Sequence, residues 1–186
     1  MQSEETQSNT MGYLTFSKLS NQTFQKAEVI NESRGFSLSA NKVVFLSYRR
    51  NDKEYVKPIV DLLHSLKVNV YIDYLDEQLP DTPSSKTASI LRERIKKSDK
   101  FMLVATPNSK DSKWIPWELG LGDGFDGYEN AIVLPITNNA LIWAEQEYFE
   151  IYGYVKEAES SINSKTDWAI FYPDRKPIWL SDWLKR

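Results

Sequence analysis

The sequence predicts an α/β fold in which a mostly parallel, five-stranded sheet is covered by helices on both faces. Short β-branched and aromatic runs alternate with segments whose apolar residues recur every three or four positions. This alternation is typical of parallel strands joined by crossover helices. The chain has 186 residues, of which 41% are hydrophobic and 26% charged, and this favours one domain with an appendage.

The N-terminal quarter lies outside the alternating pattern. Residues 1–10 are polar and acidic, and we expect them to be disordered. From Met11 to about Ile30 apolar residues recur at helical spacing, which predicts a short helix, and the following residues have the composition of a linker. We therefore expect a disordered tail (1–10), a helical extension with its linker (11–41) and the main domain (42–186).

The first strand and helix of the main domain follow one another directly. The run VVFLSY, from Val43, is predicted to be a strand buried on both faces. Asn51 is expected to begin the next helix, with Glu54 reaching back three positions in a capping box. An apolar stripe then faces the sheet: Tyr55, Ile59, Leu62, Leu63 and Leu66.

Three further units continue the pattern. VNVYID (68–73) is the predicted second strand, and the polar loop 74–86 leads to a helix in which Leu91 and Ile95 face inward. The remaining predicted elements are FMLVAT (101–106) as the third strand, AIVLPI (131–136) as the fourth, a helix in the middle of 140–158, and WAIFYP (168–173) as the fifth strand.

Chemistry-bearing residues follow several of the predicted strands. In parallel sheets ligands bind at the carboxyl ends of the strands. Tyr48, Arg49 and Arg50 come after the first strand, and the long loop 74–86 comes after the second. The arginine pair has two interpretations, because such pairs are commonly solvated surface but at this edge they can instead meet phosphate or carboxylate.

The stretch SKWIPWELGLGDG (112–124) follows the third strand. Pro116 is tolerated only in a first helical turn, so the helix should start near Trp114 or Ile115. Glu118 then lies in the opening turn, where the helix dipole favours an ionised carboxylate. An indole beside a fixed carboxylate suits a sugar ring that is becoming an oxocarbenium ion. Taken alone, the pattern favours a plainer interpretation, with the tryptophans as core anchors and Glu118 as a helix-start residue.

Several classes of function are disfavoured by composition. The net charge of −3 and the pI of about 5.3 provide no basic field for nucleic acid. Cysteine is absent and His64 is the single histidine, which excludes thiolate metal sites and makes histidine triads implausible. The glycines of 122–127 fit the letters of a dinucleotide fingerprint, but they follow a helix, so we expect helix termination there. With no signal-peptide profile and only short apolar runs, we expect a cytoplasmic protein without membrane segments or bound metal.

Three separated motifs together resemble one family, the TIR (Toll/interleukin-1 receptor) domains. VVFLSYRRND (43–52) is similar to their opening box, VYIDYLDEQLPD to their second strand and BB loop, and SDKFMLVATPNSKDSKWIPWELGLGDG to their third strand with its Trp-x-x-x-Glu signature. The resemblance covers roughly residues 42–180 and is closest to bacterial stand-alone TIR proteins. The BB loop departs from the usual glycine-bearing version because it is rich in proline and acidic residues.

The resemblance implies a flavodoxin-like fold and cleavage of NAD⁺ at the nicotinamide–ribose bond. The products would be nicotinamide with ADP-ribose or a cyclic ADP-ribose isomer, used as a signal in antiphage immunity and sensed by a downstream effector. NAD⁺ would be the substrate, with no separate cofactor. By position, Glu118 would be the catalytic glutamate and Trp114 its partner. The other substrate-binding candidates are Tyr48, Arg49, Arg50, Asp73 at the start of the loop that would rearrange on assembly, and Trp143, which approximates a family tryptophan that can contact substrate from a neighbouring subunit.

Two other functions stay open at the level of sequence. Many TIR domains are non-catalytic modules that act through TIR–TIR contacts, and such a module could keep the Trp-x-x-x-Glu pair as a fold anchor. Nucleoside deoxyribosyltransferases have a related fold and a catalytic glutamate, and they exchange bases on deoxynucleosides. Self-association is expected for the enzyme as well, because TIR enzymes commonly need oligomerisation to complete their site.

Overall fold

A computed structural model describes residues 11–21, 42–73, 84–143 and 147–186. Within these ranges eight strands form a sheet in the order β3-β2-β4-β5-β6-β7-β8, with β1 pairing to β5. The strands are β1 (Leu14–Thr15), β2 (Val43–Ser47), β3 (Asn69–Tyr71), β4 (Lys100–Ala105), β5 (Ala131–Thr137), β6 (Gly153–Glu159), β7 (Thr166–Phe171) and β8 (Ile178–Trp179).

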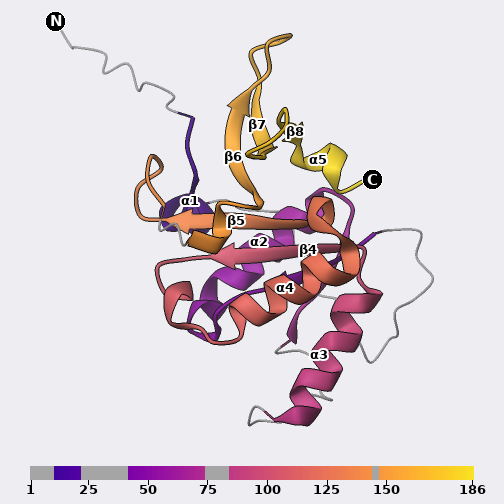
Figure 1. Cartoon of the computed structure of the whole chain (residues 1–186). Helices are drawn as coiled ribbons and strands as arrows, with labels where there is room; N and C mark the ends of the chain where they lie inside the picture. Colours follow the sequence, from indigo (N-terminus) through magenta and orange to yellow (C-terminus); the bar gives the residue numbers. More distant parts are fainter. Residues whose placement is uncertain (1–10, 22–41, 74–83, 144–146) are drawn as a thin grey trace, which may run out of the picture.

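Helices and single turns connect these strands (Figure 1). The α-helices are α1 (Phe16–Asn21), α2 (Lys53–Ser65), α3 (Ser85–Lys97), α4 (Ile115–Asp126) and α5 (Leu180–Trp183). The 3₁₀ turns are η2 (Arg50–Asp52), η4 (Ser109–Asp111), η5 (Tyr128–Asn130) and η6 (Glu147–Phe149). The strands from β3 to β6 pair in parallel, whereas β6–β7 and β7–β8 are antiparallel. The predicted mostly parallel sheet is therefore confirmed, and it is extended by antiparallel strands at one edge.

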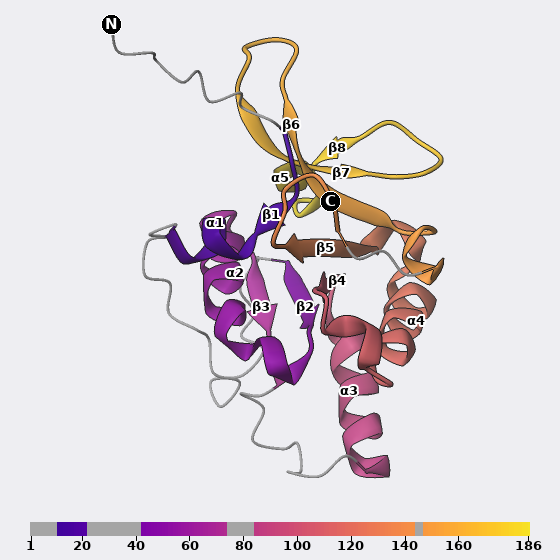
Figure 2. The same cartoon turned by 90° about the vertical axis from the view of Figure 1, so that its left-hand side faces the viewer.

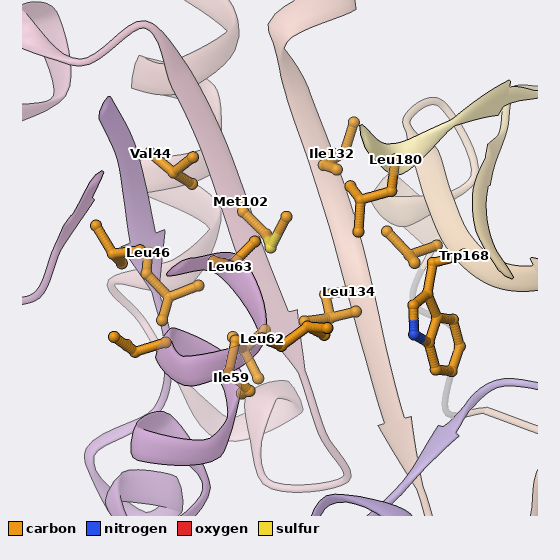
Figure 3. Packing of buried hydrophobic residues seen from close by; sticks show 14 of the residues in the cluster. Val44, Leu46, Ile59, Leu62, Leu63, Met102, Ile132, Leu134, Trp168 and Leu180 are labelled. Carbon is orange, nitrogen blue, oxygen red and sulfur yellow. The ribbon is translucent and has the colours of Figure 1, made fainter. Parts of the chain in front are cut away.

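Two layers of helices enclose the parallel strands (Figure 2). Alternate residues of β2 point to opposite faces, as in any strand. Val44 and Leu46 belong to the cluster that contains the buried residues of α1, α2 and α5, and Figure 3 shows their side chains near those of α2. Phe45 belongs instead to the cluster formed with α3 and α4. This alternation decides which side chains of β2 can reach α4.

Helix α4 lies unusually close to β4 at Gly122. A β-carbon built there would lie 2.4 Å from Cγ of Phe101, which is fully buried, whereas one at Gly124 would meet nothing within 4 Å. We expect Gly122→Ala to lower the free energy of unfolding by about 1–3 kcal/mol, because neither backbone nor ring can yield cheaply. The matched Gly124→Ala should raise it by up to about 1 kcal/mol through helix propensity. Urea unfolding of both variants checks this, and a stabilised Gly122→Ala would contradict the close packing.

The segment 140–158 corrects one expectation. The sequence predicts a helix in its middle, but the described residues there form the single 3₁₀ turn Glu147–Phe149, and Gly153–Glu159 after it is strand β6. β6 pairs with β5 at Gly153 and Tyr154 and runs antiparallel to β7 from Tyr154 to Glu159, so cross-strand pairing outweighs the weak helical periodicity. The predicted fifth strand is observed as β7, but it is antiparallel. Residues 144–146 of the expected helix lie outside the described part.

The N-terminal helix begins later in the sequence than expected. Met11 to Tyr13 are not helical, and Leu14–Thr15 forms strand β1 beside Ile136 and Thr137 of β5. Leu14 is buried against the sheet, which explains why extended pairing is preferred there. The helix begins at Phe16, and the Thr15 hydroxyl accepts a 3.1 Å hydrogen bond from the Lys18 amide. The expected tail 1–10, the rest of the helix and the linker 31–41 lie outside the described residues.

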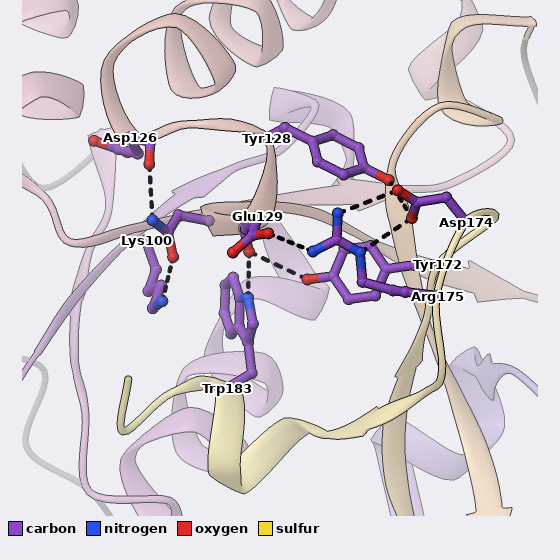
Figure 4. A network of polar contacts seen from close by, with 9 residues as sticks. Lys100, Asp126, Tyr128, Glu129, Tyr172, Asp174, Arg175 and Trp183 are labelled. Atoms are coloured by element: carbon purple, nitrogen blue, oxygen red, sulfur yellow. Dashed lines mark hydrogen bonds and ion pairs between the residues drawn. The ribbon is translucent and has the colours of Figure 1, made fainter.

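A polar network fastens the C-terminal segment to the edge opposite the carboxyl ends of β2 and β4 (Figure 4). The carbonyl of Glu129 accepts hydrogen bonds from the Trp183 indole at 2.7 Å and from the Tyr172 hydroxyl at 3.1 Å. Arg175 donates to the Glu129 carboxylate at 2.5 Å. The Lys100 ammonium lies 4.8 Å from the centre of the Trp183 ring. The tail therefore supports the far end of the sheet and leaves the carboxyl end open.

Candidate active site

A cavity of about 450 Å³ opens at the carboxyl end of the parallel strands. It is walled by the residues after β2, the end of β3, helix α3, the segment after η4 and the first turn of α4. The lining residues are Tyr48, Arg49, Arg50, Asn51, Asp73, Thr87, Leu91, Asp111, Ser112, Lys113, Trp114 and Glu118. The position agrees with the rule that ligands bind at this edge of an α/β sheet. Other hollows exist, but they lie away from Glu118.

The start of α4 places Glu118 in the cavity wall. The helix begins at Ile115 with Pro116 in second position, as Pro116 predicts. The Glu118 amide donates to the Trp114 carbonyl at 2.8 Å, and the Ser112 hydroxyl accepts from the Trp114 and Ile115 amides at 3.3 Å. Glu118 therefore lies in the opening turn, as expected, with Trp114 at the helix entrance.

A short hydrogen bond from the end of β2 holds the Glu118 carboxyl. Ser47, 2% exposed at the end of β2, donates its hydroxyl proton to Oε2 of Glu118 at 2.6 Å. Burial raises the pKa of Glu118 to about 8, the bond from Ser47 opposes the rise, and the negative charge of Asp73 adds to it. The sequence led us to expect the helix dipole to favour ionisation. A dipole contribution of about 0.3–1 kcal/mol is smaller than this loss of hydration, so burial dominates.

Trp114 forms an apolar wall beside the carboxyl group. It is half-buried and meets Trp117 edge-on, with 5.4 Å between ring centres and an 85° angle between planes. Arg92 covers the other ring from 5.4 Å. Both tryptophans pack partly against the core cluster of α3 and α4, so they are anchors of the fold as well. The two interpretations of this pair are thus compatible, because Trp114 anchors α4 and also lines the cavity.

Three cations and three acids line the cavity, and Lys113 shares its segment with the acids Asp111 and Glu118. Arg49 and Arg50 follow β2, and Lys113 precedes Trp114, whereas Asp73 ends the β3 region. The arginine pair therefore faces a cavity, which favours a role with an anionic group over a purely solvated one. Three cations near one mouth suit the diphosphate of a dinucleotide.

Asp52 ties two walls of the cavity together. It is 1% exposed and accepts hydrogen bonds from the Thr106 hydroxyl at 2.7 Å and the Asn108 amide at 2.6 Å. Asp52 follows Arg49 and Arg50 in one wall, and its two partners lie on the segment between β4 and α4, which leads to Trp114 in the other wall. The N-cap residue of α2 is Asp52 and not Asn51 as predicted, and it makes no side-chain capping bond, so the capping box predicted between Asn51 and Glu54 is not observed.

We expect Asp52→Ala to lower the free energy of unfolding by about 1–3 kcal/mol, mainly because the buried hydroxyl of Thr106 loses its acceptor, whereas the amide of the exposed Asn108 can turn to water. Glu54→Ala, at an exposed position two residues later, should change it by less than about 0.5 kcal/mol. Chemical denaturation of both variants tests this difference. Equal stability of the two variants would show that the Asp52 bonds contribute little.

The structure brings together six of the seven residues predicted to form the site. Tyr48, Arg49, Arg50, Asp73, Trp114 and Glu118 all line the cavity. Trp143 does not line it. It is 9% exposed and stacks on Phe149 at 5.6 Å within the core cluster that includes Tyr13. Residues 74–83, most of the predicted BB loop, lie outside the described part of the chain.

Sequence reasoning missed Ser47 and Lys113. Ser47 has a signal in the sequence, because it is a polar residue on an otherwise apolar strand, two positions after Phe45. Lys113 is a surface-type residue beside Trp114 and carries no distinctive pattern. Among the described residues, no group of three histidine, aspartate or glutamate side chains is placed to hold a metal ion. No helix in those same ranges is long and apolar enough to cross a bilayer.

A family model described as the TIR domain matches residues 44–155, more than half of the chain. The chain belongs to the TIR family. The match includes every described element that walls the cavity, from β2 to α4. The TIR fold, with its central mostly parallel sheet, agrees with the architecture described above.

Two curated relatives of this TIR chain carry related names. "Probable 3' cyclic ADP-D-ribose synthase ThsB'" of Bacillus cereus (strain MSX-D12) is 29% identical over 168 residues, which cover 87% of this chain and 86% of the relative. "Putative cyclic ADP-D-ribose synthase TIR2" of Cytobacillus dafuensis is 25% identical over 116 residues, 54% of this chain but 31% of that protein. The solved "Structure of the activated Roq1 resistosome directly recognizing the pathogen effector XopQ (TIR domains)" matches 52% of this chain and 57% of that chain at 25% identity, with a TM-score of 0.38.

Proposed function

We propose that this TIR chain cleaves the nicotinamide–ribose bond of NAD⁺, giving nicotinamide and ADP-ribose or a cyclic ADP-ribose isomer. The observation that carries the proposal is the Glu118 carboxyl, held by Ser47 in the wall of a cavity that also contains Trp114 and two arginines. Its relatives' names, which refer to cyclic ADP-ribose synthesis, support the same chemistry. Signalling in antiphage defence, through an effector that senses the product, is the physiological role that this proposal implies.

The reaction requires charge stabilisation more than proton transfer. When the C1′–N bond breaks, its electron pair goes to the pyridinium nitrogen, so nicotinamide leaves as a neutral molecule and needs no acid. Positive charge then develops on the ribose ring, and an ionised Glu118 beside it would stabilise that charge. In hydrolysis a water molecule attacks C1′ of the ribosyl cation and loses a proton. In cyclisation a nucleophilic group of the same ADP-ribose molecule attacks C1′ instead. NAD⁺ is consumed as substrate, and this step requires no other cofactor.

The remaining polar groups suit the rest of the dinucleotide. Arg49 and Arg50 would hold the diphosphate, and Asp73 would accept bonds from ribose hydroxyls. Tyr48 and Trp114 would exclude water from the developing cation. We propose that Trp143 contributes to the site only in an assembly. Because Trp143 is buried in the core of the single chain, the segment that carries it would have to rearrange first.

Self-association through TIR–TIR contacts is part of the proposal. The test is therefore made on purified full-length chain at high concentration, with a molecular crowder present, and follows nicotinamide release from NAD⁺. Chromatography against linear and cyclic standards then identifies the product. Release of nicotinamide supports the enzyme. Self-association with no loss of NAD⁺ favours a non-catalytic TIR module, and base exchange on deoxynucleosides with indifference to NAD⁺ favours a deoxyribosyltransferase.

A further inference from the structure

Ser47 occupies a position where an apolar side chain would be expected. It is the last residue of β2 and is 2% exposed. Because strand residues alternate between faces, Ser47 shares its face with Phe45, which packs in the cluster of α3 and α4. Val44 and Leu46 face the opposite cluster. A hydroxyl group on this face is therefore directed toward the first turn of α4.

The partner of this hydroxyl is the candidate catalytic group. Ser47 Oγ donates to Glu118 Oε2 at 2.6 Å, a length typical of hydrogen bonds to a carboxylate. Among the described residues, Ser47 is the one side chain with a hydrogen bond to this carboxyl group. A glutamate side chain has three rotatable bonds, and the 2.8 Å hydrogen bond from the Glu118 amide to the Trp114 carbonyl holds only its backbone. The direction of the carboxyl group thus depends on Ser47.

We propose that Ser47 is a positioning residue, which fixes the Glu118 carboxylate toward the bond to be broken. The inference rests on the proposed cleavage of NAD⁺ and deepens it. A buried serine has no need to bond a carboxyl group for the fold alone, because alanine fits the same space without leaving an unsatisfied donor. The pairing of a buried donor with a half-buried acid in the cavity wall is what points to a role in the site.

The charged surroundings of Glu118 set the direction of the expected pH effect. Arg49 and Arg50 line the cavity from the β2 side, Asp73 from the β3 side, and Asp111 and Lys113 from the segment before α4. Asp73 raises the pKa of Glu118, and Ser47 lowers it. Removal of the hydroxyl group should therefore leave a carboxyl group that ionises at higher pH. Since the ionised form stabilises the ribosyl cation, the rate should also rise at higher pH.

The variants Ser47→Ala and Ser47→Thr test this role, with Ser98→Ala as the matched control. Ser98 is also buried, but its hydroxyl bonds the Arg94 carbonyl at the far end of α3, away from the cavity. Steady-state nicotinamide release is measured across pH 5–9. We expect Ser47→Ala to lower kcat about tenfold or more with little change in KM, and to move the rising limb of the profile to higher pH. Ser47→Thr should restore most of the rate, and Ser98→Ala should leave the profile unchanged.

A second readout needs no turnover. Titration of ¹³C-carboxyl-labelled glutamate by NMR, with Glu118→Gln to assign the signal, reports the pKa of Glu118 directly. A higher pKa in Ser47→Ala than in the wild type supports the inference, and an equal or lower pKa overturns it, whether or not the chain cleaves NAD⁺. If wild-type protein releases no nicotinamide while the pKa shifts as expected, the proposed function fails but the coupling of Ser47 to Glu118 stands. Unchanged kcat and profile in Ser47→Ala also overturn the positioning role.

Discussion

Replacement of Glu118 by glutamine is expected to lower nicotinamide release by about 10²–10³-fold, the usual cost of losing one preorganised electrostatic group. The amide oxygen of glutamine can still accept the Ser47 hydroxyl, so the start of α4 should keep its structure. The loss should therefore appear in kcat, with the affinity for the dinucleotide largely retained. Initial rates over a range of NAD⁺ concentrations, at matched protein concentration and assembly state, measure both.

Glu54→Gln is the control for this variant. Glu54 also lies in the first turn of a helix, α2, but it is exposed and does not line the cavity. Glu54→Gln should keep wild-type turnover. If Glu118→Gln retained turnover within a few-fold of Glu54→Gln, Glu118 would not be the catalytic group.

The same substitution should make the folded chain more stable above neutral pH. In the folded chain burial raises the pKa of Glu118 from 4.5 to about 8, so between these values the folded state binds more protons than the unfolded state. The contribution of Glu118 to the free energy of unfolding is therefore fully present below about pH 4.5 and is lost as the pH rises through about 8. Each pH unit in that window is worth at most about 1.4 kcal/mol, and water in the open cavity reduces this. Glutamine has no proton to lose.

Urea unfolding at pH 5 and pH 8 measures this effect. We expect Glu118→Gln to exceed the wild type by on the order of 1–3 kcal/mol at pH 8 and by much less at pH 5. Asp126, whose pKa burial raises to about 6, titrates in both proteins and cancels in the comparison. A stability difference that is constant with pH, or that shrinks as the pH rises, would mean that Glu118 is not held in an environment that disfavours its charge.

The parts of the fold with strong local signals were predictable from the sequence. β4 and β5 are buried along their whole length and are apolar except for Lys100 at the start of β4 and Thr137 at the end of β5, and Pro116 fixes the start of α4 within one residue. The candidate site follows from these elements, because the carboxyl ends of adjacent parallel strands must lie at one edge. Tyr48 and Glu118, 70 residues apart in the sequence, line the same cavity for that reason.

The parts that depend on pairing between distant segments were not predictable. β6 has helix-forming residues such as Lys156 and Glu157, and only its pairing with β5 and β7 makes it a strand. Likewise, two residues at Leu14 form a strand because the end of β5 offers an unpaired edge. Burial also changed the expected charge state of Glu118, since desolvation is a property of the assembled cavity and has no local sequence pattern.

The most direct test of the central claim is the structure of the assembled chain bound to an NAD⁺ analogue whose nicotinamide ribose is carbocyclic and cannot be cleaved. We predict that the nicotinamide-bearing ring carbon lies about 3–3.5 Å from a carboxylate oxygen of Glu118. Its ring should rest against Trp114, with the diphosphate toward Arg49 and Arg50. An analogue bound elsewhere, or bound in this cavity with its ring turned away from Glu118, would contradict the proposed function.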